Sequence, residues 1–187
     1  GVRELIVGRR AMGPVERFFV GSTSRAVIAH ASLAVVVVPQ HGRTPERREV
    51  VVGVDGSRDS QAAVEYAFSF ASHDGASVVA VGAWDVPLPA YGEALGTELD
   101  WWRNDAQLSA AESLAGWSEK FPDVPVHTEV VQGHPVRVLA QRAEGAQLVV
   151  VGGRGRSTLR GRYLGSTAEG LARHASCPVA VVHQPAG

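Results

Sequence analysis

Continuous runs of small and branched apolar residues recur along residues 49–184, and stretches with helical spacing of apolar positions separate them. Such runs are typical of strands that are buried on both faces of a parallel sheet. They predict five strands, at residues 49–54, 76–83, 124–131, 147–152 and 178–182. The stretches between them predict helices at residues 60–72, 97–120 and 166–175, and one whose first turn begins at Pro135.

Strict alternation of strands and helices predicts an α/β fold with right-handed crossovers, that is, a doubly wound five-stranded parallel sheet. In such a sheet the ligand lies beyond the carboxyl ends of the strands, where the strand order changes direction. We therefore expect a site where the strands at residues 49–54 and 147–152 end.

The sequence contains an internal repeat. Residues 5–40 align with residues 149–184 without a gap, at a constant offset of 144 residues (8 to 152, 21 to 165, 30 to 174). Only the last forty residues of this repeat unit are present in the first copy. We therefore interpret residues 1–40 as the C-terminal fragment of a first domain, residues 41–48 as a polar linker, and residues 49–184 as a complete domain.

Composition narrows the possible partners. Apolar residues make up 45% of the chain and charged residues 20%, which is typical of an ordinary globular protein. No apolar run reaches the roughly 18 residues of a membrane span, and a net charge of −1 provides no field that attracts nucleic acid. The single cysteine, Cys177, fits a reducing compartment. We expect a cytoplasmic protein that binds neither membranes nor nucleic acid.

A glycine-rich segment follows the predicted fourth strand. Gly152-Gly153-Arg154-Gly155-Arg156-Ser157 leaves that strand, and Gly165-Ser166-Thr167 opens the last helix. Glycines allow positive φ and let backbone N–H groups approach an anion closely, and a helix N-terminus favours oxyanions. The hydroxyls of Ser166 and Thr167 either donate to a phosphate or cap the helix.

Each charged residue near this segment has two possible roles. Asp55 ends the first strand, where its carboxylate either accepts hydrogen bonds from a ribose diol or organises the turn into the next helix. The arginines of the glycine-rich segment either neutralise phosphate charge or remain solvated; they are Arg154, Arg156, Arg160 and Arg162.

Other nucleotide and catalytic motifs do not fit. The chain has no Gly-Lys-Ser/Thr, so the glycine-rich segment is not a P-loop, and no acidic residue closes a following strand as a dinucleotide site requires. The histidines show no metal-ligand spacing, and there is no Gly-x-Ser-x-Gly. We therefore assign no catalytic residue and no metal ligand.

The pattern G-x2-G-x9-G-S from Gly152 to Ser166, together with VGVDGS at the first strand and HASCPVAVV at the end, resembles the ATP-binding branch of the universal stress protein family. The resemblance covers residues 49–184 and, for its last third, residues 1–40. It implies a Rossmann-like fold of the adenine nucleotide alpha hydrolase-like kind, plus a partial second copy. Ala11 replaces the motif's second glycine in the first copy, so we expect no nucleotide site there.

The resemblance also implies which residues bind ATP, with or without Mg²⁺. Asp55 contacts the ribose, and Gly53, Ala83 and Val131 lie on the adenine side. The phosphates contact the two glycine segments, through Gly152, Arg154, Gly155, Arg156, Ser157, Thr158, Gly165, Ser166 and Thr167.

These features favour a regulatory stress-response module rather than an enzyme, since no base, second carboxylate or Mg²⁺ ligand set accompanies the phosphate loop. A signalling partner, which the sequence does not identify, would read nucleotide occupancy and dimerisation. The alternatives are a slow ATPase or phosphotransferase, and a sensor of AMP or cyclic AMP. Family members pair their final strands antiparallel, so we expect residues 33–38 to pair with residues 178–182. The strand at residues 5–7 then lacks a neighbour, which predicts a homo-oligomer.

Overall fold

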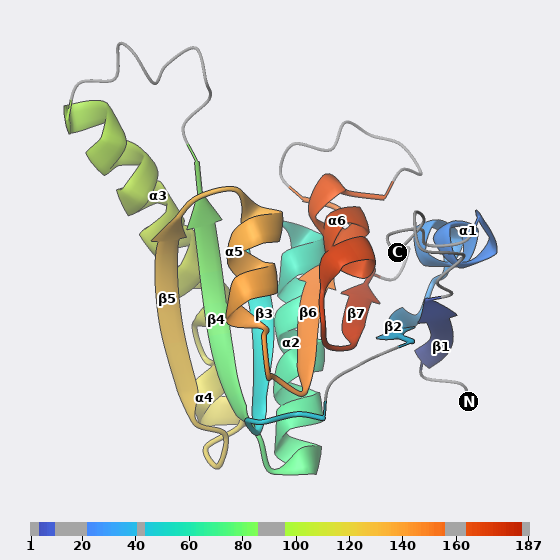
Figure 1. Ribbon diagram of the computed structural model, residues 1–187. Coiled ribbons are helices and arrows are strands. Elements are labelled where there is room, and N and C mark those ends of the chain that lie inside the picture. Colours follow the sequence, from blue (N-terminus) through green and yellow to red (C-terminus); the bar gives the residue numbers. More distant parts are fainter. Residues whose placement is uncertain (1–3, 10–21, 41–43, 86–95, 156–163, 185–187) are drawn as a thin grey trace.

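The computed structural model describes residues 4–9, 22–40, 44–85, 96–155 and 164–184, which form one sheet with helices on both faces (Figure 1). Its strands are β1 (Glu4–Arg9), β2 (Ala34–Pro39), β3 (Glu49–Val54), β4 (Ser77–Trp84), β5 (Val126–Gln132), β6 (Leu148–Gly152) and β7 (Val179–Val182). Its helices are α1 (Ser22–His30), α2 (Arg58–Asp74), α3 (Gly96–Leu114), α4 (Trp117–Lys120), α5 (Pro135–Arg142) and α6 (Ser166–His174).

The five strands predicted within residues 49–184 are all present and run parallel to one another. They lie in the order β7-β6-β3-β4-β5, so β3 pairs with β6 on one side and with β4 on the other. Val51 of β3 faces Val149 and Val79 in the two registers, and its side chain is fully buried. The strand order changes direction between β3 and β6, which is where the sequence predicts the site.

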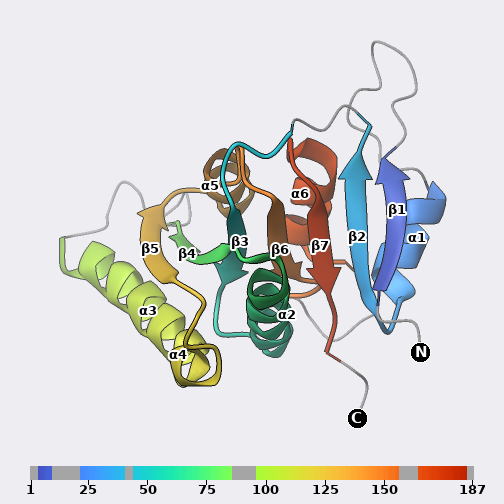
Figure 2. The ribbon, with the colours of Figure 1, turned by 90° about the horizontal axis from the view of Figure 1, so that it is seen from below.

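The N-terminal segment, residues 4–40, adds two more strands to this sheet. β1 runs parallel to β2, and β2 pairs antiparallel with β7, with Val35 opposite Val181 and Val37 opposite Val179. The predicted pairing of residues 33–38 with residues 178–182 is therefore confirmed. The sheet has seven strands, because this antiparallel contact joins the N-terminal segment to the predicted five (Figure 2).

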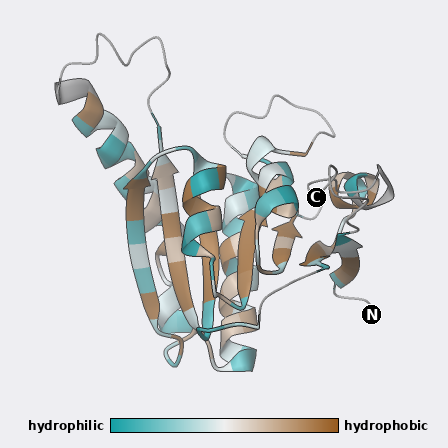
Figure 3. Ribbon diagram, in the orientation of Figure 1, coloured by the Kyte–Doolittle hydropathy of each residue, from teal (hydrophilic) through white to brown (hydrophobic). Residues whose placement is uncertain are grey.

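Successive strand residues point into two apolar cores, one on each face of the sheet. Figure 2 shows α2, α3 and α4 on one face and α5 and α6 on the other, and the strands between them are strongly apolar (Figure 3). Val50 and Val52 belong to the first core, where Phe68 stacks on Trp117 at a centroid distance of 5.5 Å. Val51 belongs to the second core, which also contains Ile28 of α1. The N-terminal segment thus shares a core with α5 and α6.

Helix boundaries differ from the prediction, most clearly at the start of α2 and within residues 97–120. α2 begins at Arg58 rather than at residue 60, because the hydroxyl of Ser57 accepts a hydrogen bond from the Ser60 amide and caps the helix. The single helix predicted over residues 97–120 is instead α3 and α4, separated at Gly116, whose φ of 78° ends a right-handed helix. No helix in the described part of the chain is long and apolar enough to cross a membrane.

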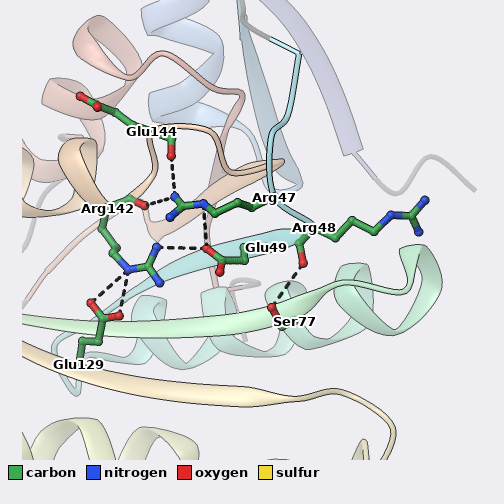
Figure 4. A network of polar contacts seen from close by, with 7 residues as sticks. All are labelled: Arg47, Arg48, Glu49, Ser77, Glu129, Arg142 and Glu144. Atoms are coloured by element: carbon green, nitrogen blue, oxygen red, sulfur yellow. Dashed lines mark hydrogen bonds and ion pairs between the residues drawn. The ribbon is translucent and has the colours of Figure 1, made fainter.

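Charged side chains fix the segment that precedes β3 (Figure 4). Arg47 donates to the carbonyl oxygens of Arg142 and Glu144 and pairs with Glu49 at 3.3 Å. The guanidinium of Arg142 lies between Glu49 and Glu129, at 3.1 and 2.9 Å. The start of the central strand is therefore held against the end of α5.

Candidate functional site

A pocket of about 500 Å³ lies beyond the carboxyl ends of β3, β4 and β6. Its walls also include the N-terminus of α6, the start of α5 and one face of α3. Most of the predicted site residues line it; they are Gly53, Asp55, Ala83, Gly152, Arg154, Gly155, Gly165, Ser166 and Thr167. Residues from four elements, far apart in sequence, thus meet at the switch point of the sheet.

The remaining predicted residues are placed elsewhere or are not described. Val131 lies opposite Ala83 in the β4–β5 ladder, but its side chain is 37% exposed and does not line the pocket. Arg156, Ser157 and Thr158 lie outside the described residues, as do Arg160 and Arg162.

Asp55 directly follows β3, and its carboxylate organises the turn into α2, which is one of the two predicted roles. Its Oδ1 accepts a hydrogen bond from the Ser57 amide at 3.0 Å, which shapes the entry into α2. Its Oδ2 points toward the glycine loop, since a Cβ added at Gly155 would lie 2.8 Å from it. The same carboxylate therefore organises a turn and lies against the loop at Gly155.

The motif positions require glycine because neighbouring atoms lie where a Cβ would be, and not because the backbone has unusual angles. Among the described motif positions, no glycine has a positive φ, so the predicted use of positive φ is wrong there. A Cβ at Gly152 would lie 2.7 Å from the backbone carbonyl carbon of Asp59 in α2, and one at Gly165 would lie 3.2 Å from the Gly153 oxygen. Gly152 thus allows α2 to pack on β6, and Gly165 lets α6 approach the loop.

The N-terminus of α6 points at the pocket. Gly165 is its N-cap, with no capping side-chain bond, and the Gly165 amide donates to the Gly153 oxygen at 2.7 Å. Ser166 and Thr167 follow inside the first turn and line the pocket, so neither of them is the helix cap. They lie beside first-turn amides, which have no acceptor within the helix itself, and this position suits an oxyanion.

Arg154 is the one loop arginine whose position is described. Its Nε lies 3.2 Å from Oδ2 of Asp59, a carboxylate whose side chain is only 9% exposed. The arginine side chain itself is 46% exposed and lines the pocket. The positive charge is therefore anchored to α2 at the rim of the pocket rather than fully solvated.

One wall of the pocket consists of residues outside the predicted binding set. Trp102, Asp105, Ala106 and Ser109 of α3 line it, together with Trp84 at the end of β4 and Asp85 directly after it. The α3 residues recur at i, i+3, i+4 and i+7, which is one face of a helix. That spacing and the position of Trp84 at a strand end are the signals that would have found them.

Cys177 offers no nucleophile to this pocket. Its side chain is buried in the second apolar core, and it does not line the pocket. Burial raises the pKa of the Cys177 thiol to about 11. The thiol therefore stays protonated and unreactive near neutral pH.

Comparison with known proteins identifies the family. The family model of the universal stress protein family matches residues 1–39 and 46–183. The chain belongs to the universal stress protein family. Universal stress protein Rv2005c of Mycobacterium tuberculosis is 39% identical over 184 residues, which cover 96% of this chain and 61% of that protein. The chain thus spans about three fifths of the length of the curated universal stress proteins it matches.

Solved universal stress proteins share the fold. UspA from Lactobacillus plantarum is 27% identical and superposes with a TM-score of 0.62, over 73% of this chain and 98% of its own. A universal stress protein solved in complex with cAMP is 28% identical, with a TM-score of 0.54 over 72% of this chain and 96% of its own. The structural relatives therefore include a nucleotide-bound member.

Proposed function

We propose that this protein is an ATP-binding regulatory module of the stress response. The observation that carries the proposal is the pocket at the switch point, where Asp55 faces the glycine loop and the N-terminus of α6. A carboxylate suits a ribose diol, and glycine backbone with helix amides suits a phosphate chain. Both recognition elements line the same cavity, so one nucleotide could contact them together.

In this proposal, each part of the nucleotide contacts a different wall of the pocket. Gly53 and Ala83, with Leu139 beside them, give an apolar floor for the adenine ring, and Trp102 of α3 gives an aromatic wall. The volume of about 500 Å³ lies within the range of small-molecule sites. The loop from Gly152 to Thr158 and residues 165–167 then bind the phosphates.

Cyclic AMP is the second candidate ligand, because a 28% identical relative was solved with it. It carries one phosphate diester and a ribose whose 3′-oxygen is no longer a hydroxyl. ATP presents a free diol to Asp55 and a longer anionic chain to the loop and α6. The two ligands can therefore be distinguished by how much the binding of each depends on Asp55, as well as by their affinities.

Nucleotide-stripped protein is expected to bind ATP once per chain, with micromolar affinity, or about 8 kcal/mol. Isothermal titration calorimetry gives stoichiometry and affinity, with and without Mg²⁺, and competition with cAMP ranks the two ligands. Two sites per chain would contradict the assignment to residues 49–184. Absence of ATP binding, with tight cAMP binding, would replace ATP by the second candidate.

Turnover is expected to be negligible, on the order of less than one per minute, against 1–10³ s⁻¹ for typical enzymes. Asp55 already accepts the Ser57 amide, and Asp59 is paired with Arg154, so neither is arranged as a general base for an attacking water. The turnover rate is measured as the release of inorganic phosphate from ATP by protein that is free of contaminating ATPases. Enzyme-like rates that disappear in Asp55→Ala would establish the ATPase alternative instead.

A regulatory role needs a readout beyond the pocket. In this proposal nucleotide occupancy changes the glycine loop and the association of chains, and a signalling partner recognises the result. The contact between Ile28 of α1 and His183, which packs against Gly153 of the glycine-rich loop, offers a path for such a change.

A further inference from the structure

Two reciprocal contacts join the N-terminal segment to the rest of the protein. Nη1 of Arg9, at the end of β1, donates to the carbonyl oxygens of Ala172, Arg173 and Ala175 at the C-terminus of α6. In the other direction, Nε2 of His183 lies 2.6 Å from the carbonyl oxygen of Ile28 in α1. Positions 28 and 172 are equivalent in the 144-residue repeat, so each half binds the same carbonyl of the other half's helix.

His183 has a fixed orientation. A carbonyl oxygen only accepts, so the hydrogen of the contact with Ile28 lies on Nε2. The ring's other nitrogen, Nδ1, lies 3.8 Å from Oδ2 of Asp59, and both side chains are less than a tenth exposed. The same Oδ2 pairs with Arg154, and Oδ1 of Asp59 accepts from the Gln184 amide. One ring nitrogen is therefore fixed by a hydrogen bond to Ile28, and the other faces the buried carboxylate of Asp59.

The glycine loop rests on this ring. A Cβ added at Gly153 would lie 2.0 Å from Cε1 of His183, so the loop backbone packs directly against the imidazole. The Gly153 amide donates to the Val182 oxygen at 2.8 Å, and its oxygen accepts from the Gly165 amide. Gly153 thus connects the end of β7 to the N-terminus of α6, and His183 lies beneath that connection.

We propose that His183 is a positioning residue for the phosphate-binding loop, and that α1 of the N-terminal segment holds it in place through the Ile28 carbonyl. This inference rests on the proposed function, since it assigns the loop to phosphate. Loss of the Ile28 contact frees the ring to rotate, and Gly153 and Arg154 then lose the surface that orders them. Nucleotide affinity accordingly depends on the docking of α1, about one repeat away in sequence.

The test compares four stripped proteins by calorimetric titration with ATP: wild type, His183→Phe, His183→Gln and Arg9→Met. Phe keeps a flat ring but has no donor, so we expect about tenfold weaker binding. Gln retains an amide donor for the Ile28 carbonyl, and we expect affinity within about threefold of wild type. Arg9→Met removes the reciprocal contact far from the loop, so it should lower the melting temperature but change affinity less than threefold.

Amide hydrogen exchange without nucleotide provides a second readout, because it reports loop order directly. We expect the Gly153 and Gly165 amides to exchange about tenfold faster in His183→Phe than in wild type or Arg9→Met. Equal affinity and equal exchange in wild type and His183→Phe would overturn the inference, as would equal losses in His183→Phe and Arg9→Met. Failure of wild type to bind any nucleotide would instead reject the proposed function, and the exchange rates would still decide the role of His183.

Discussion

Gly155→Val is expected to abolish nucleotide binding and to leave the fold intact. The Cβ of the valine would lie 2.8 Å from Oδ2 of Asp55, and its methyl groups would occupy the space between the loop and that carboxylate. Gly155 belongs to neither apolar core, so the free energy of unfolding should change little. We expect a loss of more than a hundredfold in affinity, about 2.7 kcal/mol or more. Calorimetric titration measures the loss, and circular dichroism checks the fold.

Two comparison variants separate a loop effect from a general one. Gly8→Val, at the repeat position equivalent to Gly152, has no heavy atom within 4 Å of the added Cβ, so binding should stay at the wild-type level. Asp55→Ala removes the ribose contact but keeps the phosphate elements, so we expect a smaller, measurable loss than for Gly155→Val. Binding by Gly155→Val within threefold of wild type would show that the loop does not contact the ligand.

Much of the fold was predictable because the sequence pattern of the strands fits no other element. Valine-rich runs such as residues 49–54 and 147–152 have no competing helical pattern, and their alternation with helices fixes a parallel, doubly wound order. The pairing of residues 33–38 with residues 178–182 came from the family resemblance and was confirmed. Helix ends were less predictable, since Ser57 and Gly116 act through local hydrogen bonding and a single left-handed residue.

The positions of most site residues could be predicted from the sequence, but the contacts that require those residues could not. The glycine spacing places the loop, yet Gly152 is required by the backbone of Asp59, a contact between residues 93 positions apart. Periodicity within one segment carries no information on such a contact. The same holds for His183, whose role depends on Ile28 and Gly153 at once. The wall from α3 had a helical spacing that could be recognised, but only the tertiary structure shows which face meets the pocket.

The exposed edge of β1 leads to the last prediction, that this chain self-associates. In the described part of the sheet β1 pairs only with β2, and its side chains include Ile6 at 68% and Leu5 at 38% exposure, on opposite faces.

An apolar strand with an open hydrogen-bonding edge is a template for a second chain, so light scattering should show at least two chains per particle. Ile6→Lys places a charge on that edge and should shift the particle to a monomer. Leu108→Lys changes another exposed apolar residue, on α3 and at 59% exposure, and should leave the mass unchanged. If chains instead exchange residues 1–40, Ile6→Lys keeps the wild-type mass, and only deletion of residues 1–40 alters it. A wild-type monomer over a wide concentration range would contradict both forms of association.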